Sequence, residues 1–160
     1  MTEEPEYVEF TEGSADEVLD RMARLAAAQQ GWMNFEPAVD VDDLPPPRSP
    51  LFGLLSGRGP DVPLATWAAG TAPKGRGRPE PPTIGLLHPA GARARAALAE
   101  QGHPVPDGWV VLQDFSKKGL VVAVPPAVAH ADVVAWLLRA ARLLSAVPLT
   151  GQWRAAVYEG

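Results

Sequence analysis

The chain of 160 residues contains no cysteine. This excludes disulfide bonds, thiolate metal sites and a cysteine nucleophile. It also has no apolar run close to the roughly 20 residues that a membrane-spanning helix needs. The first six residues are acidic where a secretory signal is basic and then apolar. We therefore expect a cytoplasmic protein without a membrane span, and its weight of Ala, Gly, Pro and Arg is typical of a GC-rich bacterial genome.

Basic residues are scarce in the first quarter of the chain. Residues 1–43 hold 12 of the 19 acidic residues and only two basic ones, for a net charge of −10, whereas residues 44–160 carry a net charge of +5. The acidic front either folds onto the basic remainder or is offered to a basic partner. Residues 1–13 are predicted to form an acidic N-terminal arm. Alternatively, Tyr7, Val8 and Phe10 add a short edge strand to a sheet.

The remaining residues, 14–160, have the length of one globular domain. Helices are expected near 14–30, 88–102 and 131–145, and strands near 32–39, 62–67, 83–87, 109–115, 120–124 and 153–158. This order predicts an α+β fold with two layers, in which about three helices pack on a mixed, mostly antiparallel sheet of five to six strands. The proline cluster at 45–50 ends one strand, and the Gly, Pro and basic residues at 70–82 predict a mobile loop.

Several local signals carry more specific predictions. Ser14 and Glu17 have the spacing of a capping box at the start of the first helix, and Pro89 suits the first position of the second. The prolines near 62–67 favour an edge strand. The hairpin over 109–124 is almost entirely apolar, so it is predicted to be central and covered on both faces, or covered on one face and paired in a dimer.

The junction between the strand at 83–87 and the following helix is a candidate anion site. A helix N-terminus presents free N–H groups, Gly91 allows close approach, and His88, Arg93 and Arg95 can supply positive charge. The segment lacks the glycine spacing of a dinucleotide-binding or P-loop motif. An ordinary capped helix with exposed arginines is the alternative interpretation.

Asp114 is a carboxylate inside an otherwise apolar strand. If it is buried, its pKa is raised and it can act as a general base beside His88. Alternatively, it accepts N–H bonds from Ser116 or Lys117 in the turn that follows. No nucleophile elbow accompanies it. His88, His103 and His130 have no metal-ligand spacing, so neither a metal nor a cofactor is expected.

Tryptophan and basic residues offer two further surfaces. Trp32, Trp67 and Trp136 are candidate anchors for a protein partner, with Trp136 expected to be partly exposed, although tryptophan also fills cores. The basic run at 74–78 has no interleaved aromatic residue, and the whole chain is acidic. Both facts argue against nucleic-acid binding.

The predicted order of elements is similar to that of small secretion-chaperone-like domains, a likeness of element order alone. With no catalytic constellation in the sequence, we expect a non-catalytic protein-binding module, of adaptor or chaperone-like type, with an unidentified protein partner or a second copy of itself. The alternative is a small-ligand-binding domain or enzyme whose anion site lies at His88–Arg95.

Overall fold

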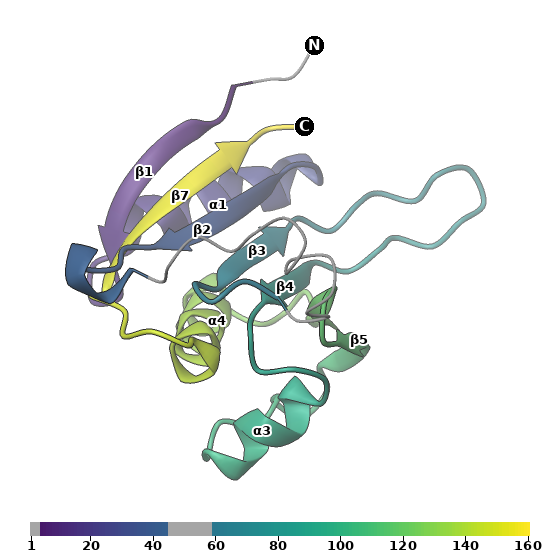
Figure 1. The fold of residues 1–160 in the computed structure, drawn as a ribbon. Helices are drawn as coiled ribbons and strands as arrows, with labels where there is room; N and C mark the ends of the chain where they lie inside the picture. The colour runs from purple at the N-terminus through teal and green to yellow at the C-terminus, as the bar shows by residue number, and fades with distance from the viewer. Residues whose placement is uncertain (1–3, 45–58) are drawn as a thin grey trace.

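The computed structural model of the chain describes residues 4–44 and 59–160, and its centre is a sheet of seven strands in the order β1-β7-β2-β3-β4-β6-β5 (Figure 1). Every pairing in this sheet is antiparallel. The strands are β1 (Glu6–Thr11), β2 (Trp32–Pro37), β3 (Leu64–Ala68), β4 (Thr83–Leu87), β5 (Val110–Phe115), β6 (Gly119–Ala123) and β7 (Gln152–Tyr158). The helices in the described residues are α1 (Asp16–Ala28), α3 (Ala94–Glu100) and α4 (His130–Leu144), with a short 3-10 turn, η1, at Val41–Asp43.

The predicted two-layer α+β fold is confirmed, with two refinements to its sheet. The sheet has seven strands rather than five or six, and it is wholly antiparallel rather than mixed. The helices pack on one face, where alternate strand residues such as Phe35, Trp67 and Val122 are buried. This alternation is the expected pattern for a sheet with one covered face. The proline cluster at 45–50 lies outside the described residues.

The first strand resolves the two interpretations of the acidic front. Residues 6–11 form an edge strand that pairs with β7, from Glu6 opposite Val157 to Thr11 opposite Gln152. Glu6 is paired with Arg21, whose hydrogen bond lowers the pKa of the Glu6 carboxyl. Glu12 accepts hydrogen bonds from Arg142 at 2.8 Å and from the Trp153 indole at 3.2 Å. Part of the acidic front therefore folds onto the rest of the chain.

The predicted capping box is wrong. Helix α1 begins at Asp16, and its N-cap residue is Ala15, which makes no side-chain capping hydrogen bond. Ser14 instead takes part in a tight turn after β1, in which the Ser14 N–H donates to the Thr11 carbonyl at 3.1 Å. At the other end of α1, Gln29 takes the left-handed capping position, with φ of 54°.

Three further expectations are corrected. Helix α3 begins at Ala94 and not at Pro89, because Gly91 and Arg93 both have positive φ and the chain between β4 and α3 is a loop. Strand β3 lies between β2 and β4, so it is not an edge strand; Pro63 precedes it and disturbs no pairing. The β5–β6 hairpin forms as predicted, but β5 is the end strand of the sheet and is not central.

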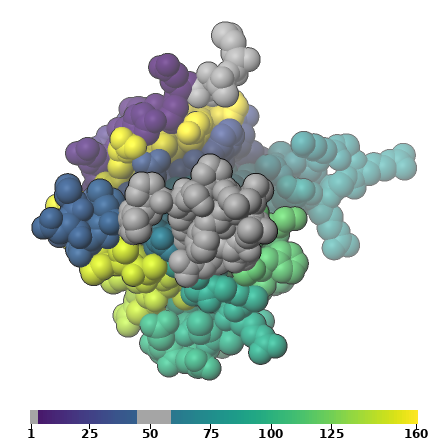
Figure 2. Space-filling model, viewed as in Figure 1, coloured from purple at the N-terminus to yellow at the C-terminus, as the bar shows by residue number. Residues whose placement is uncertain are grey.

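The segment at 70–82 projects from the body between β3 and β4 (Figures 1 and 2). Its base is closed by a backbone bridge between Thr71 and Glu80, with N···O distances of 3.0 and 3.1 Å. The basic residues of the predicted loop therefore lie away from the β4–α3 junction.

Candidate functional site

The candidate anion site at the start of α3 is occupied by a side chain of the protein itself. Asp114 accepts hydrogen bonds from the backbone N–H groups of Ala94, at 3.0 Å, and Arg95, at 3.2 Å. Its place in the sheet explains this direction, since Asp114 lies opposite the buried Leu120 and so points to the helix-covered face. A carboxylate there satisfies two otherwise unpaired helix donors and complements the helix dipole.

This contact differs from the turn role predicted for Asp114 and gives the carboxylate a structural partner instead. The carboxylate bonds neither Ser116 nor Lys117, and it caps a helix some twenty residues earlier in the chain. Both carboxylate oxygens accept backbone N–H groups, so Asp114 has a structural role as the cap of α3. The structure brings Asp114 beside Arg93 and Arg95, as the catalytic alternative required, but the N–H groups that a ligand needs are already bonded.

His88 lies fully buried behind this junction. Its Nδ1 accepts the Ala90 N–H at 3.1 Å, so the proton of the neutral ring is on Nε2, which has no hydrogen-bond partner among the described residues. Burial lowers the pKa of His88, and the negative charge of Asp114 partly opposes that shift. The ring is therefore neutral near pH 7 and enclosed, with no exposed surface to offer a ligand.

The remaining members of the predicted site are on the surface. Arg93, with φ of 68°, and Arg95 are exposed, and a Cβ added at Gly91 meets no atom within 4 Å. Glycine at position 91 is therefore explained by the positive φ of 85° in the loop, and not by the close approach of a ligand. The junction is built as the connection between a strand and a helix.

Replacing Asp114 with alanine is expected to lower the free energy of unfolding by about 1 kcal/mol, the usual cost of removing a helix cap. Asp114→Asn keeps one carbonyl acceptor for the α3 amides, so it is expected to lose less. Urea unfolding of the two variants and the parent chain measures the difference. Equal stability of Asp114→Ala and the parent would show that the cap contributes nothing.

The three tryptophans proposed as anchors have different environments. Trp67 is 1% exposed and Trp136 is 7% exposed, so the expectation of a partly exposed Trp136 is wrong and neither can anchor a partner on the surface. The Trp136 indole donates to the Pro104 carbonyl at 3.0 Å, which satisfies its polar atom within the core. Trp32 is 41% exposed and stacks on Tyr158 with ring centroids 4.8 Å apart.

No cluster of three His, Cys, Asp or Glu residues has the geometry to hold a metal ion within residues 4–44 and 59–160. No helix in this part of the chain has the length and hydropathy to cross a bilayer. A groove of about 370 Å³ runs between α1 and α4, and its lining includes Leu19, Val134 and Arg139 but no residue of the predicted anion site.

The most unusual surface lies at the end of the sheet, on β5. Val110, Leu112 and Phe115 are 57%, 59% and 57% exposed, and we call these three side chains with the outer backbone of their strand the β5 edge. Sheets commonly protect such edges with charged side chains. Strand β1, at the opposite end, carries Glu6 and Glu9, whereas the one charged residue of β5 is Asp114, which is turned to α3.

The sequence indicated that this strand is apolar, but not that it lies at the end of the sheet. The apolar pattern of the hairpin predicted a buried strand, and only the strand order shows that, among the described strands, β5 has a neighbour on one side alone. A β-bulge adds to the exposure of this strand. The pairing with β6 shifts between Val111 and Gln113 and leaves Leu112 outside the register.

An α+β fold of this kind hosts many unrelated functions, so the fold class assigns no activity. Comparison with family models, with curated proteins and with solved structures finds no match to this chain.

Proposed function

We propose that the protein is a non-catalytic protein-binding module, of adaptor or chaperone-like type, that acts in the bacterial cytoplasm and takes an extended polypeptide segment along the β5 edge. The observation that supports this most is the combination of an end strand without protective charge and three large apolar side chains that are more than half exposed.

The chemistry of a sheet edge suits an extended partner. The outer N–H and C=O groups of an end strand can bond a further strand, and pockets or side chains along the edge give specificity. Fully burying a large apolar side chain contributes about 1.5–3 kcal/mol. Covering the exposed halves of Val110, Leu112 and Phe115 would therefore contribute roughly 1 kcal/mol or more for each.

The alternative, an anion-binding domain or small enzyme at His88–Arg95, has less support. Asp114 already bonds the helix amides, and His88 is enclosed. Helix α3 is also only seven residues long, so its dipole offers little to a ligand.

A peptide selection tests the proposal. Short random peptides displayed on phage are selected against the full chain, and the enriched ones are measured by fluorescence anisotropy. We expect extended sequences with alternating apolar residues, and acidic residues where they pass Lys117 and Lys118. Binding should be lost in Leu112→Lys, which adds a charge to the edge, and kept in Val41→Lys, a matched change at an 83% exposed apolar residue elsewhere.

Two results would contradict the proposal. Equal binding to the Leu112→Lys and Val41→Lys variants would place any peptide site away from the β5 edge. Enrichment of no peptide, together with no self-association, would leave the edge without a binding role.

A further inference from the structure

We infer that the β5 edge binds the β5 edge of a second copy of this chain, which makes a two-fold dimer with one continuous antiparallel sheet. This inference rests on the proposed function, since it names the partner of the same surface. Three properties of the edge support it: the charges at its two ends, the positions of its apolar side chains, and the contrast with β1.

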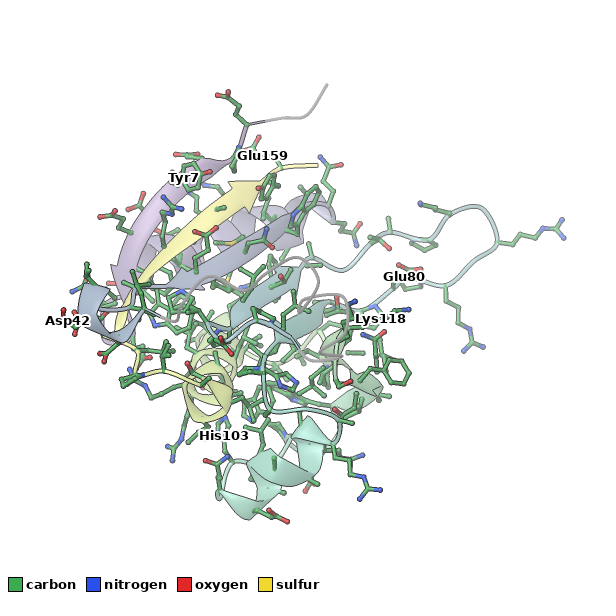
Figure 3. The ribbon with its side chains drawn as sticks, viewed as in Figure 1. Tyr7, Asp42, Glu80, His103, Lys118 and Glu159 are labelled. Carbon is green, nitrogen blue, oxygen red and sulfur yellow. The ribbon has the colours of Figure 1, made fainter. Side chains whose placement is uncertain are left out.

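The charges at the two ends of β5 are opposite. Asp107 lies before the strand, and Lys117 and Lys118 lie in the turn after it, where Figure 3 labels Lys118. All three are exposed, and none forms an ion pair with another described residue. In a two-fold antiparallel pair, the start of one strand faces the end of the other. Each negative end would therefore meet a positive end of the other copy.

The β-bulge determines which register brings the apolar side chains together. Val110 and Phe115 are five positions apart, which in a regular strand would place them on opposite faces. Their partners on β6, Ala123 and Gly119, are four positions apart, so the bulge returns Val110 and Phe115 to the same face. That face is the one without helices, because the neighbouring Leu120 and Val122 point into the core.

One register satisfies both conditions. With Val110 of one copy opposite Phe115 of the other, side chains that face each other lie on the same side of the sheet, and the pair occurs twice by symmetry. The same register places Leu112 opposite Gln113, and it brings the turn that holds Asp107 near the turn that holds Lys117 and Lys118 of the other copy. The apolar contacts and the charge pairs therefore coincide.

The opposite edge of the sheet cannot pair with itself in this way. Strand β1 and its lead-in carry Glu4, Glu6 and Glu9, all of one sign, so two copies would place like charges together. Strand-to-strand contacts of six residues are small compared with stable interfaces, which bury about 1,200 Å² or more. We therefore expect a reversible dimer whose population depends on concentration.

Sedimentation velocity of the full chain, from low micromolar to several hundred micromolar, tests the dimer. We expect a monomer–dimer equilibrium with no larger species. Asp107→Lys and Lys118→Asp each place like charges at both ends of the interface, so each is expected to weaken the dimer by about tenfold. An equimolar mixture of the two variants restores opposite charges at both ends and should dimerise as well as the parent chain. Asp42→Lys, an equal charge change at η1, should leave the equilibrium unchanged.

The outcomes separate this inference from the proposed function. A parent chain that stays monomeric while selected peptides still bind at Leu112 would overturn the inference and leave the proposed function standing. A dimer whose population is unchanged by both charge substitutions would place the interface elsewhere and would also overturn the inference. Species larger than the dimer would overturn it too, because they indicate a head-to-tail contact. Restoration in the mixture, lost again on Leu112→Lys, would establish the register.

Discussion

Gly119→Ala is expected to lower the free energy of unfolding by roughly 2–5 kcal/mol, which combines a backbone and a packing cost. Gly119 has φ of +81°, a left-handed conformation that costs an alanine about 1–2 kcal/mol. An added Cβ would also lie 2.3 Å from the backbone carbonyl oxygen of Leu86 on β4. A carbonyl in the middle of a sheet cannot move aside without breaking its pairing, so the clash must distort the β5–β6 hairpin.

Gly108→Ala is the matched control. Gly108 has φ of +86°, but a Cβ added there meets no atom within 4 Å. Its replacement therefore reports the backbone cost alone, about 1 kcal/mol. Urea unfolding of the two variants separates the terms, and a loss in Gly119→Ala no larger than that in Gly108→Ala would show that the hairpin and β4 are farther apart than the structure places them.

Trp67→Ala is expected to lower the free energy of unfolding by about 3–5 kcal/mol, as a large core deletion does. Trp67 is 1% exposed and packs edge-on against His130, with ring centroids 5.6 Å apart. Its removal opens a cavity between the sheet and α4 that the surrounding side chains fill only in part. Thermal unfolding followed by circular dichroism would record a large fall in Tm.

The comparison variant is Trp32→Ala, on the neighbouring strand β2. Trp32 faces the side of the sheet without helices, is 41% exposed, and loses mainly its stack on Tyr158, so we expect a change of about 1 kcal/mol. The register places Met33 beside Trp67 and Trp32 beside Ala68, which is why the two tryptophans point to opposite faces. Similar losses from both variants would contradict this assignment of faces.

Local patterns in the sequence predicted the elements whose signals are local. Helix α4 lies within one residue of its expected start and end, and its apolar residues Val134, Leu137 and Leu138 are buried. The predicted β5–β6 hairpin forms, with Gly119 at positive φ in its turn. The period of apolar residues suffices to predict the helix, and two apolar runs around a turn glycine suffice to predict the hairpin. Both signals work because the contacts that they specify are close in the chain.

The sequence was less informative about the candidate site. Asp114 was identified as unusual, but its hydrogen bonds reach Ala94 and Arg95, across a span that no local pattern describes. Pro89 suggested a helix start, and the chain instead formed a loop through Gly91 and Arg93. The capping box at Ser14 did not form. Ser14 lies in the turn after β1, where its N–H and C=O both bond the backbone of Thr11.

By itself the sequence determined the class of the fold, the hairpin, the last helix and the absence of cysteine chemistry. Only the tertiary structure decided the order of the strands, and with it the exposure of Val110, Leu112 and Phe115. The physical reason is that a strand's apolar pattern reports how its side chains are covered, whereas its position in a sheet depends on backbone pairing with distant segments. The same apolar hairpin that would fill the centre of one sheet forms an unprotected edge in this one.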